Sequence, residues 1–385
     1  MKVMLLTLLP AALCAQSWTP LFDGKSLNGW KQCNGKAEYK VENGEIVGTT
    51  AEGSPNSFLC TTREYGDFIL EWESKNDPVL NSGVQIRSHQ YPQAAGRHPA
   101  GRVYGYQVEI ANEASGNSGG IYDEARRAVF LHEKIDPAAA KAFKDNQWNK
   151  YRVEAIGDNF KVSINGVQVL DLIDAEDLTG FIALQVHSFK GEKPAQVRWR
   201  NIRIQDLGRH TWRPLWDGKT LNGWTVTGPA KWTIENGAIH GQSVPNETAA
   251  GFVVGKETFK DLTVRWKVQI NKGNSGFFVR TDPSNMAAYE VEIDAEKRTG
   301  GFWEVRGRNW VTGPEDNKNY KPGEWNTMAA SLRGHRITFF LNGIKTVDLP
   351  NDSTGRTEGV LAMQCHTRME TDVWFKDIEV LEKAR

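Results

Sequence analysis

Two stretches of the chain are nearly identical, WTPLFDGKSLNGW at 18–30 and WRPLWDGKTLNGW at 212–224. Later segments repeat in the same order: VENG at 41–44 matches IENG at 234–237, YQVEI at 106–110 matches YEVEI at 289–293, and LQVH at 184–187 matches MQCH at 363–366. A period this long indicates a duplicated domain rather than a solenoid. We therefore expect two copies of one domain, at 16–207 and 212–385, joined by a linker at 208–211.

Each copy has the pattern of antiparallel β-structure. Apolar and polar residues alternate in Phe68–Trp72 and in Leu262–Trp266, which is the period of a half-buried strand. Asn-Gly pairs, typical of tight hairpins, lie between such runs. Helical signal is confined to about one or two turns at 136–143. This pattern predicts an all-β fold, with a two-sheet sandwich of jelly-roll type in each copy.

Composition and the first residues narrow the class of protein. Lys+Arg and Asp+Glu both number 47, and this balance argues against a nucleic-acid binder. Lys2, the apolar run 3–9 and the alanines up to Ala15 have the layout of a secretory signal peptide at 1–15. We expect a periplasmic or secreted protein without a membrane span. A lipoprotein site at Cys14 is less favoured, because the bulky Leu13 precedes it.

Three cysteines remain in the mature chain, Cys33, Cys60 and Cys365. They lack the close spacing of a structural zinc site. In an oxidising compartment Cys33 and Cys60 either pair, closing a loop of about 27 residues, or stay unlinked. The sequence leaves both possibilities open. Cys365 lies in an apolar run and is expected to be a buried free thiol.

Strand alternation places polar residues of three strands on one sheet face. In the first copy these are Gln85, Arg87 and His89, then Gln107 and Glu109, then Gln185 and His187. A guanidinium, a carboxylate, an imidazole and amides form a set suited to binding hydroxyl groups and transferring protons. The alternative is an ordinary solvated sheet face.

The two copies differ beside this face. Between Arg87 and Tyr106 the first copy has a long segment containing Tyr91, Arg97, His98 and Arg102, whereas the matching segment of the second copy is about half as long. Long loops at the rim of a sheet are where ligand specificity usually resides. We therefore expect the working site in the first copy, although an ordinary surface loop is the alternative.

Several motifs resemble a known family. They are LFDGKSLNGW at 21–30, NSGVQIR at 81–87, GYQVEI at 105–110 and GIYDE at 120–124. The chain is similar in both copies to the 3-keto-disaccharide hydrolase family, also described as 3-keto-glucoside 1,2-lyase/3-keto-2-hydroxy-glucal hydratase. The resemblance implies two tandem concanavalin A-like jelly-roll β-sandwiches that cleave glycosides oxidised at C3. The second copy departs from the pattern at Glu290 and around 302–304.

This resemblance implies roles for the candidate residues. Removal of the C2 proton, β-elimination at C1 and rehydration need a base, an enolate stabiliser and a proton donor. We expect Glu109 or His187 as the base and Arg87 as the stabiliser. Asp123 or Glu124 would donate the proton or bind a divalent metal; no cofactor is certain. Substrate contacts are expected from Gln85, His89, Gln107, Tyr122, Glu124, Arg126 and Gln185.

Two other classes of function remain open. The same fold hosts lectins as readily as enzymes, so a non-catalytic carbohydrate-binding protein is the main alternative. A scaffold whose paired domains only present loops is the second. Turnover of a 3-keto-glucoside separates the enzyme from both.

Overall fold

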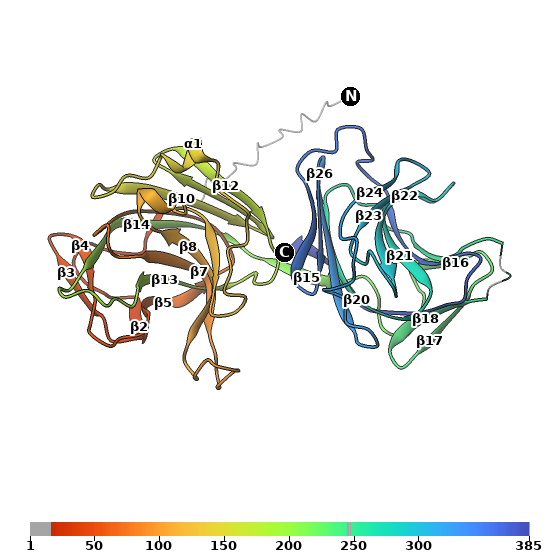
Figure 1. Cartoon of the computed structure of the whole chain (residues 1–385), viewed down its shortest axis with the longest axis horizontal. Coiled ribbons are helices and arrows are strands. Elements are labelled where there is room, and N and C mark those ends of the chain that lie inside the picture. Colours follow the sequence, from red (N-terminus) through yellow and green to blue (C-terminus); the bar gives the residue numbers. More distant parts are fainter. Residues whose placement is uncertain (1–16, 245, 247, 385) are drawn as a thin grey trace, which may run out of the picture. The chain divides into compact units, whose positions relative to one another are not determined.

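A computed structural model describes residues 17–244, 246 and 248–384. The signal peptide expected at 1–15 lies outside the described residues. The chain forms two compact units, one extending to His210 and the other comprising Thr211–Lys383. Strands make up nearly all the regular structure of both units (Figure 1). Within the described part, no helix has the length and apolar character needed to cross a bilayer.

The described part of the first unit contains fourteen strands and two short helical turns. The helical turns are the 3-10 turn Glu113–Ser115 and α1, Pro137–Ala140, which lies within the segment where a short helix was expected and which Asp136 caps. The strands are β1 (Thr19–Pro20), β2 (Trp30–Asn34), β3 (Glu38–Glu42), β4 (Glu45–Thr49), β5 (Ser57–Tyr65), β6 (Asp67–Asn76), β7 (Ser82–Gln90), β8 (Val103–Ile110), β9 (Ile121–Glu124), β10 (Asn149–Ile156), β11 (Asn159–Ile164), β12 (Val167–Ile173), β13 (Gly180–Val186) and β14 (Gln196–Gly208).

These strands form two antiparallel sheets. The back sheet has the order β12-β11-β10-β6-β14-β4-β3, with β1 paired to β14. The front sheet has the order β2-β5-β13-β7-β8-β9. Neighbours in space are often distant in sequence, as in β6 with β14, which is the connectivity of a jelly roll.

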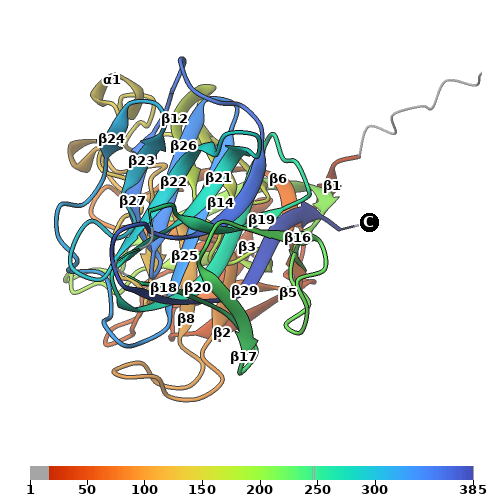
Figure 2. The same cartoon turned by 90° about the vertical axis from the view of Figure 1, so that its right-hand side faces the viewer.

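The second unit repeats this plan. Its strands are β15 (His210–Pro214), β16 (Trp224–Thr227), β17 (Lys231–Glu235), β18 (Ala238–Ser243), β19 (Gly251–Gly255), β20 (Leu262–Lys272), β21 (Asn274–Asp282), β22 (Ala287–Asp294), β23 (Phe302–Val305), β24 (Asn309–Thr312), β25 (Asn326–Arg333), β26 (Arg336–Leu341), β27 (Ile344–Leu349), β28 (Val360–Cys365) and β29 (Thr371–Lys383). The back sheet is β17-β18-β29-β20-β25-β26-β27, with β15 on β29, and the front sheet is β16-β19-β28-β21-β22-β23-β24. Figure 2 shows β18, β20, β25 and β29 as neighbouring arrows.

The core of each unit lies between its two sheets, where every second residue of a strand is apolar. Trp72 stacks on Tyr151 at 4.8 Å between ring centroids, and Trp266 stacks on Phe277 at 3.9 Å. Burying each large side chain of this kind contributes about 1.5–3 kcal/mol to stability. The prediction of an all-β fold with two tandem concanavalin A-like jelly-roll sandwiches is confirmed.

The repeated opening motif forms the same local structure twice. The carboxylate of Asp23 accepts hydrogen bonds from the backbone N–H groups of Lys25 and Ser26, both at 2.8 Å. Trp30 then donates its indole N–H to the carbonyl oxygen of Leu21 at 2.7 Å. Trp224 and Leu215 make the equivalent bond at 3.2 Å. The motif therefore closes a turn and fixes the start of β2 and β16.

Candidate active site

A cavity of about 320 Å³ opens on the outer face of the front sheet of the first unit. We call it the front-sheet cavity. Strands β8 and β9 supply part of its walls. The rest comes from the loop 91–102 and from the segments before β5, before β7, after β9 and after β13. The residues that line it are Asn56, Asn81, Arg97, His98, Arg102, Gln107, Glu109, Tyr122, Glu124, Ala125, Ala128, Phe130 and His187.

Glu109 lies on β8 at the floor of this cavity and is only 6% exposed. One carboxylate oxygen accepts a hydrogen bond from the Asn81 amide, and the other accepts one from Gln107 Nε2 at 3.0 Å. Burial raises the pKa of Glu109 above its usual value, although the hydrogen bonds from Asn81 and Gln107 oppose the shift. A carboxyl group with a raised pKa is a stronger base once it is ionised.

Amide side chains continue from Glu109 across the sheet. Gln107 Oε1 accepts hydrogen bonds from Gln185 Nε2 at 2.6 Å and from Gln85 Nε2 at 3.4 Å. Gly83 makes room for this chain, because a Cβ atom at that position would come within 2.5 Å of the Gln107 side chain. The glycine of the NSG segment is therefore explained by the close approach of Gln107.

His187 and Glu124 stand on opposite sides of Asn56. The Nδ1 atom of His187 lies 2.7 Å from the carbonyl oxygen of Ser188, and the N–H of Ser188 donates to Asn56 Oδ1 at 3.0 Å. Asn56 in turn donates Nδ2 to Glu124 Oε1 at 3.3 Å, and Arg102 forms an ion pair with the same carboxylate. In the neutral ring, the contact with Ser188 leaves the lone pair on Nε2.

Five of the eleven predicted site residues line the cavity, and two more support it. The lining residues are Gln107, Glu109, Tyr122, Glu124 and His187. Gln85 and Gln185 lie beside them, in hydrogen bonds to Gln107. Tyr122 also packs edge-on against Phe130, with ring centroids 5.3 Å apart.

The location predicted for Arg87 was wrong. A bulge after Ile86 shifts the register of β7, and Arg87 adopts a φ of 45°, so its side chain leaves the outer face. The fully buried guanidinium donates to the carbonyl oxygens of Gly66 at 2.7 Å and Gly157 at 2.6 Å and pairs with Asp67 at 3.2 Å. Arg280 repeats this bulge in the second unit, with a φ of 49°. Arg87 therefore stabilises the sandwich and does not lie in the cavity with Glu109.

Asp123, a predicted proton donor or metal ligand, does not line the cavity. Alternation along β9 continues without a break, so Asp123 faces inward beside Ile121 while Tyr122 and Glu124 face the cavity. Its carboxylate, which is fully buried, binds Arg126 and Arg127. The second unit has an equivalent network of Glu304, Arg308, Asp352 and Tyr289. A network present in both units indicates a structural role.

His89 and Arg126 lie outside the cavity as well. His89 Nε2 is 3.5 Å from a carboxylate oxygen of Asp177, and Arg126 pairs with the other oxygen at 2.8 Å. The bulge that displaces Arg87 also changes the register before His89. These two residues belong to a charged group around Asp177.

Other lining residues were not predicted as site residues. Arg97, His98 and Arg102 belong to the long loop that the comparison of the two copies had singled out. Asn81 belongs to the repeated NSG segment, so its recurrence as Asn274 was a usable signal. For Asn56 the sequence carries no such signal, because it lies in an irregular segment before β5.

The second unit has a different set of groups on the equivalent face. Pairing along β8 and β22 makes Glu290 the counterpart of Gln107 and Val305 the counterpart of Glu124. Glu290 and Glu292 therefore lie two residues apart on one face of β22. Burial raises the pKa of Glu292 to about 7 and that of Glu290 well above its usual value. The pair of amide and carboxylate in the first unit is thus a pair of carboxylates here.

The metal ligands suggested by the sequence do not come together. Glu109, Glu124 and His187 line the cavity, but Asp123 points to the opposite face. Within residues 17–244, 246 and 248–384, no three His, Cys, Asp or Glu side chains converge as metal ligands would. Dependence on a divalent metal stays a prediction, which activity after chelation tests.

The fold and the cavity define a class: a duplicated jelly-roll protein with a buried carboxylate, an imidazole and amides in a polar pocket. The family described as the 3-keto-alpha-glucoside-1,2-lyase-like domain matches residues 17–205 and 211–381, so the chain belongs to this family. This makes it a carbohydrate-active, glycosyl hydrolase-like protein.

A curated protein to which the chain is similar is a 3-keto-disaccharide hydrolase from Bacteroides thetaiotaomicron. It is 39% identical over 74 residues, which cover 17% of this chain and 25% of the relative. Similar solved structures include a glycosyl hydrolase-like protein from Parabacteroides distasonis, with 20% identity, a TM-score of 0.35 and coverage of 50% of this chain and 95% of that one. A β-glucanase from Bacillus licheniformis has 14% identity, a TM-score of 0.35 and coverage of 49% of this chain and 97% of that one.

Proposed function

We propose that the front-sheet cavity cleaves glycosides whose sugar ring carries a ketone at C3. The observation that carries this proposal is Glu109, a buried carboxyl group with a raised pKa that two amides orient inside a polar cavity. Such a group is suited to abstracting a weakly acidic carbon-bound proton. The similarity to a 3-keto-disaccharide hydrolase supports the choice of substrate class.

The reaction balances in two steps. A base removes the C2 proton, which the C3 ketone acidifies, and the electron pair moves into an enolate. Collapse of the enolate forms the C1–C2 double bond and expels the C1 oxygen substituent, which takes up a proton. Water then adds at C1 and C2 regains a proton, so that the net change is hydrolysis.

We assign the base to Glu109 and the proton donor for the leaving oxygen to His187, because both line the same cavity. A protonated Nε2 of His187 can donate while its Nδ1 is held by the Ser188 carbonyl oxygen. The role first given to Arg87 passes to Arg97 and Arg102, whose positive charges lie at the same cavity. Cationic groups stabilise negative charge that develops on the C3 oxygen.

The cavity fits a small, hydroxyl-rich ligand. Its volume of about 320 Å³ is at the lower end of small-molecule sites, in keeping with a single sugar ring inside and the aglycone at the mouth. The Gln107 and Asn56 amides supply both donors and acceptors for hydroxyl groups. We also propose export to the periplasm or beyond, which the disulfide between Cys33 and Cys60 supports.

A direct test uses a 3-keto-glucoside with a chromogenic aglycone. Wild-type protein is expected to release the aglycone and to show a transient enone absorbance. In deuterated water, the product should carry deuterium at C2, which simple acid-catalysed hydrolysis does not introduce. Binding of the sugar without release of the aglycone would favour the lectin-like alternative. If the protein neither binds the sugar nor releases the aglycone, the proposal is wrong.

A further inference from the structure

A disulfide between Cys33 and Cys60 joins β2 to β5 in the first unit. Strand β2 is the edge of the front sheet, so β5 is its single neighbour in that sheet. The pairing of the two strands is interrupted at Cys33, because the register shifts between Gln32 and Asn34. The disulfide therefore fastens an edge strand at the point where its backbone ladder is broken.

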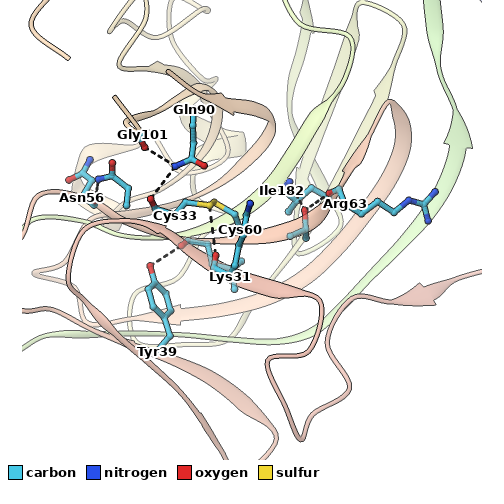
Figure 3. The surroundings of a disulfide bond; sticks show 12 residues. Lys31, Cys33, Tyr39, Asn56, Cys60, Arg63, Gln90, Gly101 and Ile182 are labelled. Carbon is cyan, nitrogen blue, oxygen red and sulfur yellow. Dashed lines mark hydrogen bonds between the residues drawn. A yellow bond between two sulfur atoms is a disulfide. The ribbon is translucent and has the colours of Figure 1, made fainter. Parts of the chain in front are cut away.

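One set of hydrogen bonds leads from Cys33 to the cavity rim. Gln90 Nε2 donates to the carbonyl oxygen of Cys33 at 3.1 Å and to that of Gly101 at 2.8 Å, as Figure 3 shows. Gly101 also donates its N–H to the carbonyl oxygen of Tyr91 at 2.8 Å. These bonds close the base of the loop 91–102, which carries the lining residues Arg97, His98 and Arg102.

A second set leads from the neighbouring residue to the cavity wall. Asn34 Nδ2 donates to the carbonyl oxygen of Asn56 at 2.7 Å. The Asn56 side chain holds Glu124 on one side and the backbone of Ser188, next to His187, on the other. The position of β2 is thereby transmitted to two functional groups of the cavity.

The second unit provides a natural comparison. There β16 pairs with β19 in regular register from Trp224 to Thr227, and Val254 takes the place of Cys60. The segment between β21 and β22 is also short, at 283–286. The disulfide, the bulge and the long loop thus occur together in the unit that has the front-sheet cavity.

We propose that the Cys33–Cys60 disulfide is a positioning element of the front-sheet cavity. It holds β2 so that Gln90 and Asn34 fix the loop 91–102 and Asn56 in place for substrate binding. This inference rests on the proposed function of the cavity only for its kinetic readout. Its structural readout, the mobility of the loop and of Asn56, requires no substrate.

The test compares the double variant Cys33→Ala/Cys60→Ala with wild type. Backbone hydrogen exchange is expected to accelerate in 91–102 and 54–56. KM for a 3-keto-glucoside is expected to rise about tenfold with a smaller change in kcat, since misplacement of binding groups by a fraction of an ångström is sufficient for such losses. Asn34→Ala and Gln90→Ala keep the disulfide, and each should reproduce the effect in its own segment.

Two controls separate positioning from loss of stability. Val162→Ala removes apolar volume from the core at β11, on the back sheet, and lowers stability without touching β2. Cys365→Ala removes the buried free thiol of the second unit. Neither control should change KM or exchange in 91–102. Faster exchange confined to β2 and β5 in the double variant, with KM unchanged, would overturn the proposal. Absence of turnover in wild type would remove the proposed function alone.

Discussion

At the scale of single residues, two buried carboxylates of the first unit, Asp67 and Glu109, differ in their hydrogen-bond partners and in the direction of their pKa shifts. Burial favours the protonated form of Asp67, yet hydrogen bonds from His210 and Gly157 and the charge of Arg87 hold its pKa below the usual value. Glu109 is also buried and has amides as its hydrogen-bond donors, and burial is the main cause of its raised pKa. At Asp67 the hydrogen bonds from His210 and Gly157, together with the charge of Arg87, outweigh the effect of burial, whereas the amide donors to Glu109 do not. The raised pKa of Glu109 supports its proposed role as the base, whereas the lowered pKa of Asp67 fits a structural anion.

Replacing Glu109 by glutamine should leave a folded protein with at least a hundredfold lower kcat/KM, since a general base contributes about 10²- to 10⁴-fold. In wild type, kcat/KM should rise with pH through the raised pKa of Glu109, because the ionised form is the active one. The measurement is a pH profile of kcat/KM. Glu292→Gln in the second unit is the matched control and should keep most activity; equal losses would indicate two active sites.

Arg87→Met tests the structural role of the arginine. Removing one partner of a buried ion pair leaves Asp67 uncompensated and should lower the free energy of unfolding by about 3–5 kcal/mol. Denaturant unfolding of the full chain measures this loss in the first unit. A variant with wild-type stability and no activity would instead return Arg87 to the enolate-stabilising role first predicted for it.

At the scale of strands, alternation explains both what the sequence could predict and where it failed. On β8 it correctly placed Gln107 and Glu109 on the outer face and Tyr106 on the inner face. On β7 the same rule failed after Ile86, because one bulge adds a residue and reverses the facing of those that follow. The positive φ of Arg87 has no sequence signature, since glycine or asparagine would be the usual residue there.

The sequence predicts the conformation of loops even less well than the position of bulges. The long segment 91–102 was identified as a rim because the second copy is shorter there. Which of its side chains reach the cavity depends on its closure by Gln90 and Gly101, which involves contacts distant in sequence. Asn56 is the extreme case, since its position follows from Asn34 and Ser188 rather than from any local pattern.

Strand β22 of the second unit supports a prediction about pH. A carboxyl group whose folded pKa is raised stabilises the fold at low pH, and this contribution is lost as pH rises from the unfolded value through the folded one. For Glu292 that window runs from about 4.5 to about 7. The stability of the second unit should therefore fall across it, and the nearby carboxylate of Glu290 adds to the fall.

Glu290→Gln should flatten this fall and raise the stability of the second unit at pH 8 by at least about 1 kcal/mol, since one unit of pKa corresponds to about 1.4 kcal/mol. Denaturant-dependent hydrogen exchange at the amides of β22 measures this in the full chain. Gln107→Glu in the first unit creates the same pair of carboxylates beside Glu109. It should make the stability of the first unit fall more steeply with pH and lower it at pH 8. An unaltered pH profile in Glu290→Gln would show that the two carboxylates do not interact.

At the scale of the whole molecule, the two units share a framework and differ on the outer face of the front sheet. The buried arginine on its bulge and the tyrosine–aspartate–arginine network occur in both units. The outer faces of the front sheets differ in charge, loop length and disulfide.

The boundary between the copies supports the last prediction. The sequence places the end of the first copy at 207, but His210 Nδ1 lies 2.6 Å from Asp67 Oδ2, and Asp67 in turn holds Arg87. A fragment ending at 210 keeps this contact, and a fragment ending at 207 loses it. A hydrogen bond to a charged group contributes about 1.5–3 kcal/mol. We therefore expect 16–210 to unfold cooperatively, to be more stable than 16–207 by about that amount, and to retain turnover of a 3-keto-glucoside. Thermal and urea unfolding of the two fragments measure the difference. His210→Ala in the longer fragment should remove the gain, and aggregation of both fragments would show that the first unit requires the second to fold.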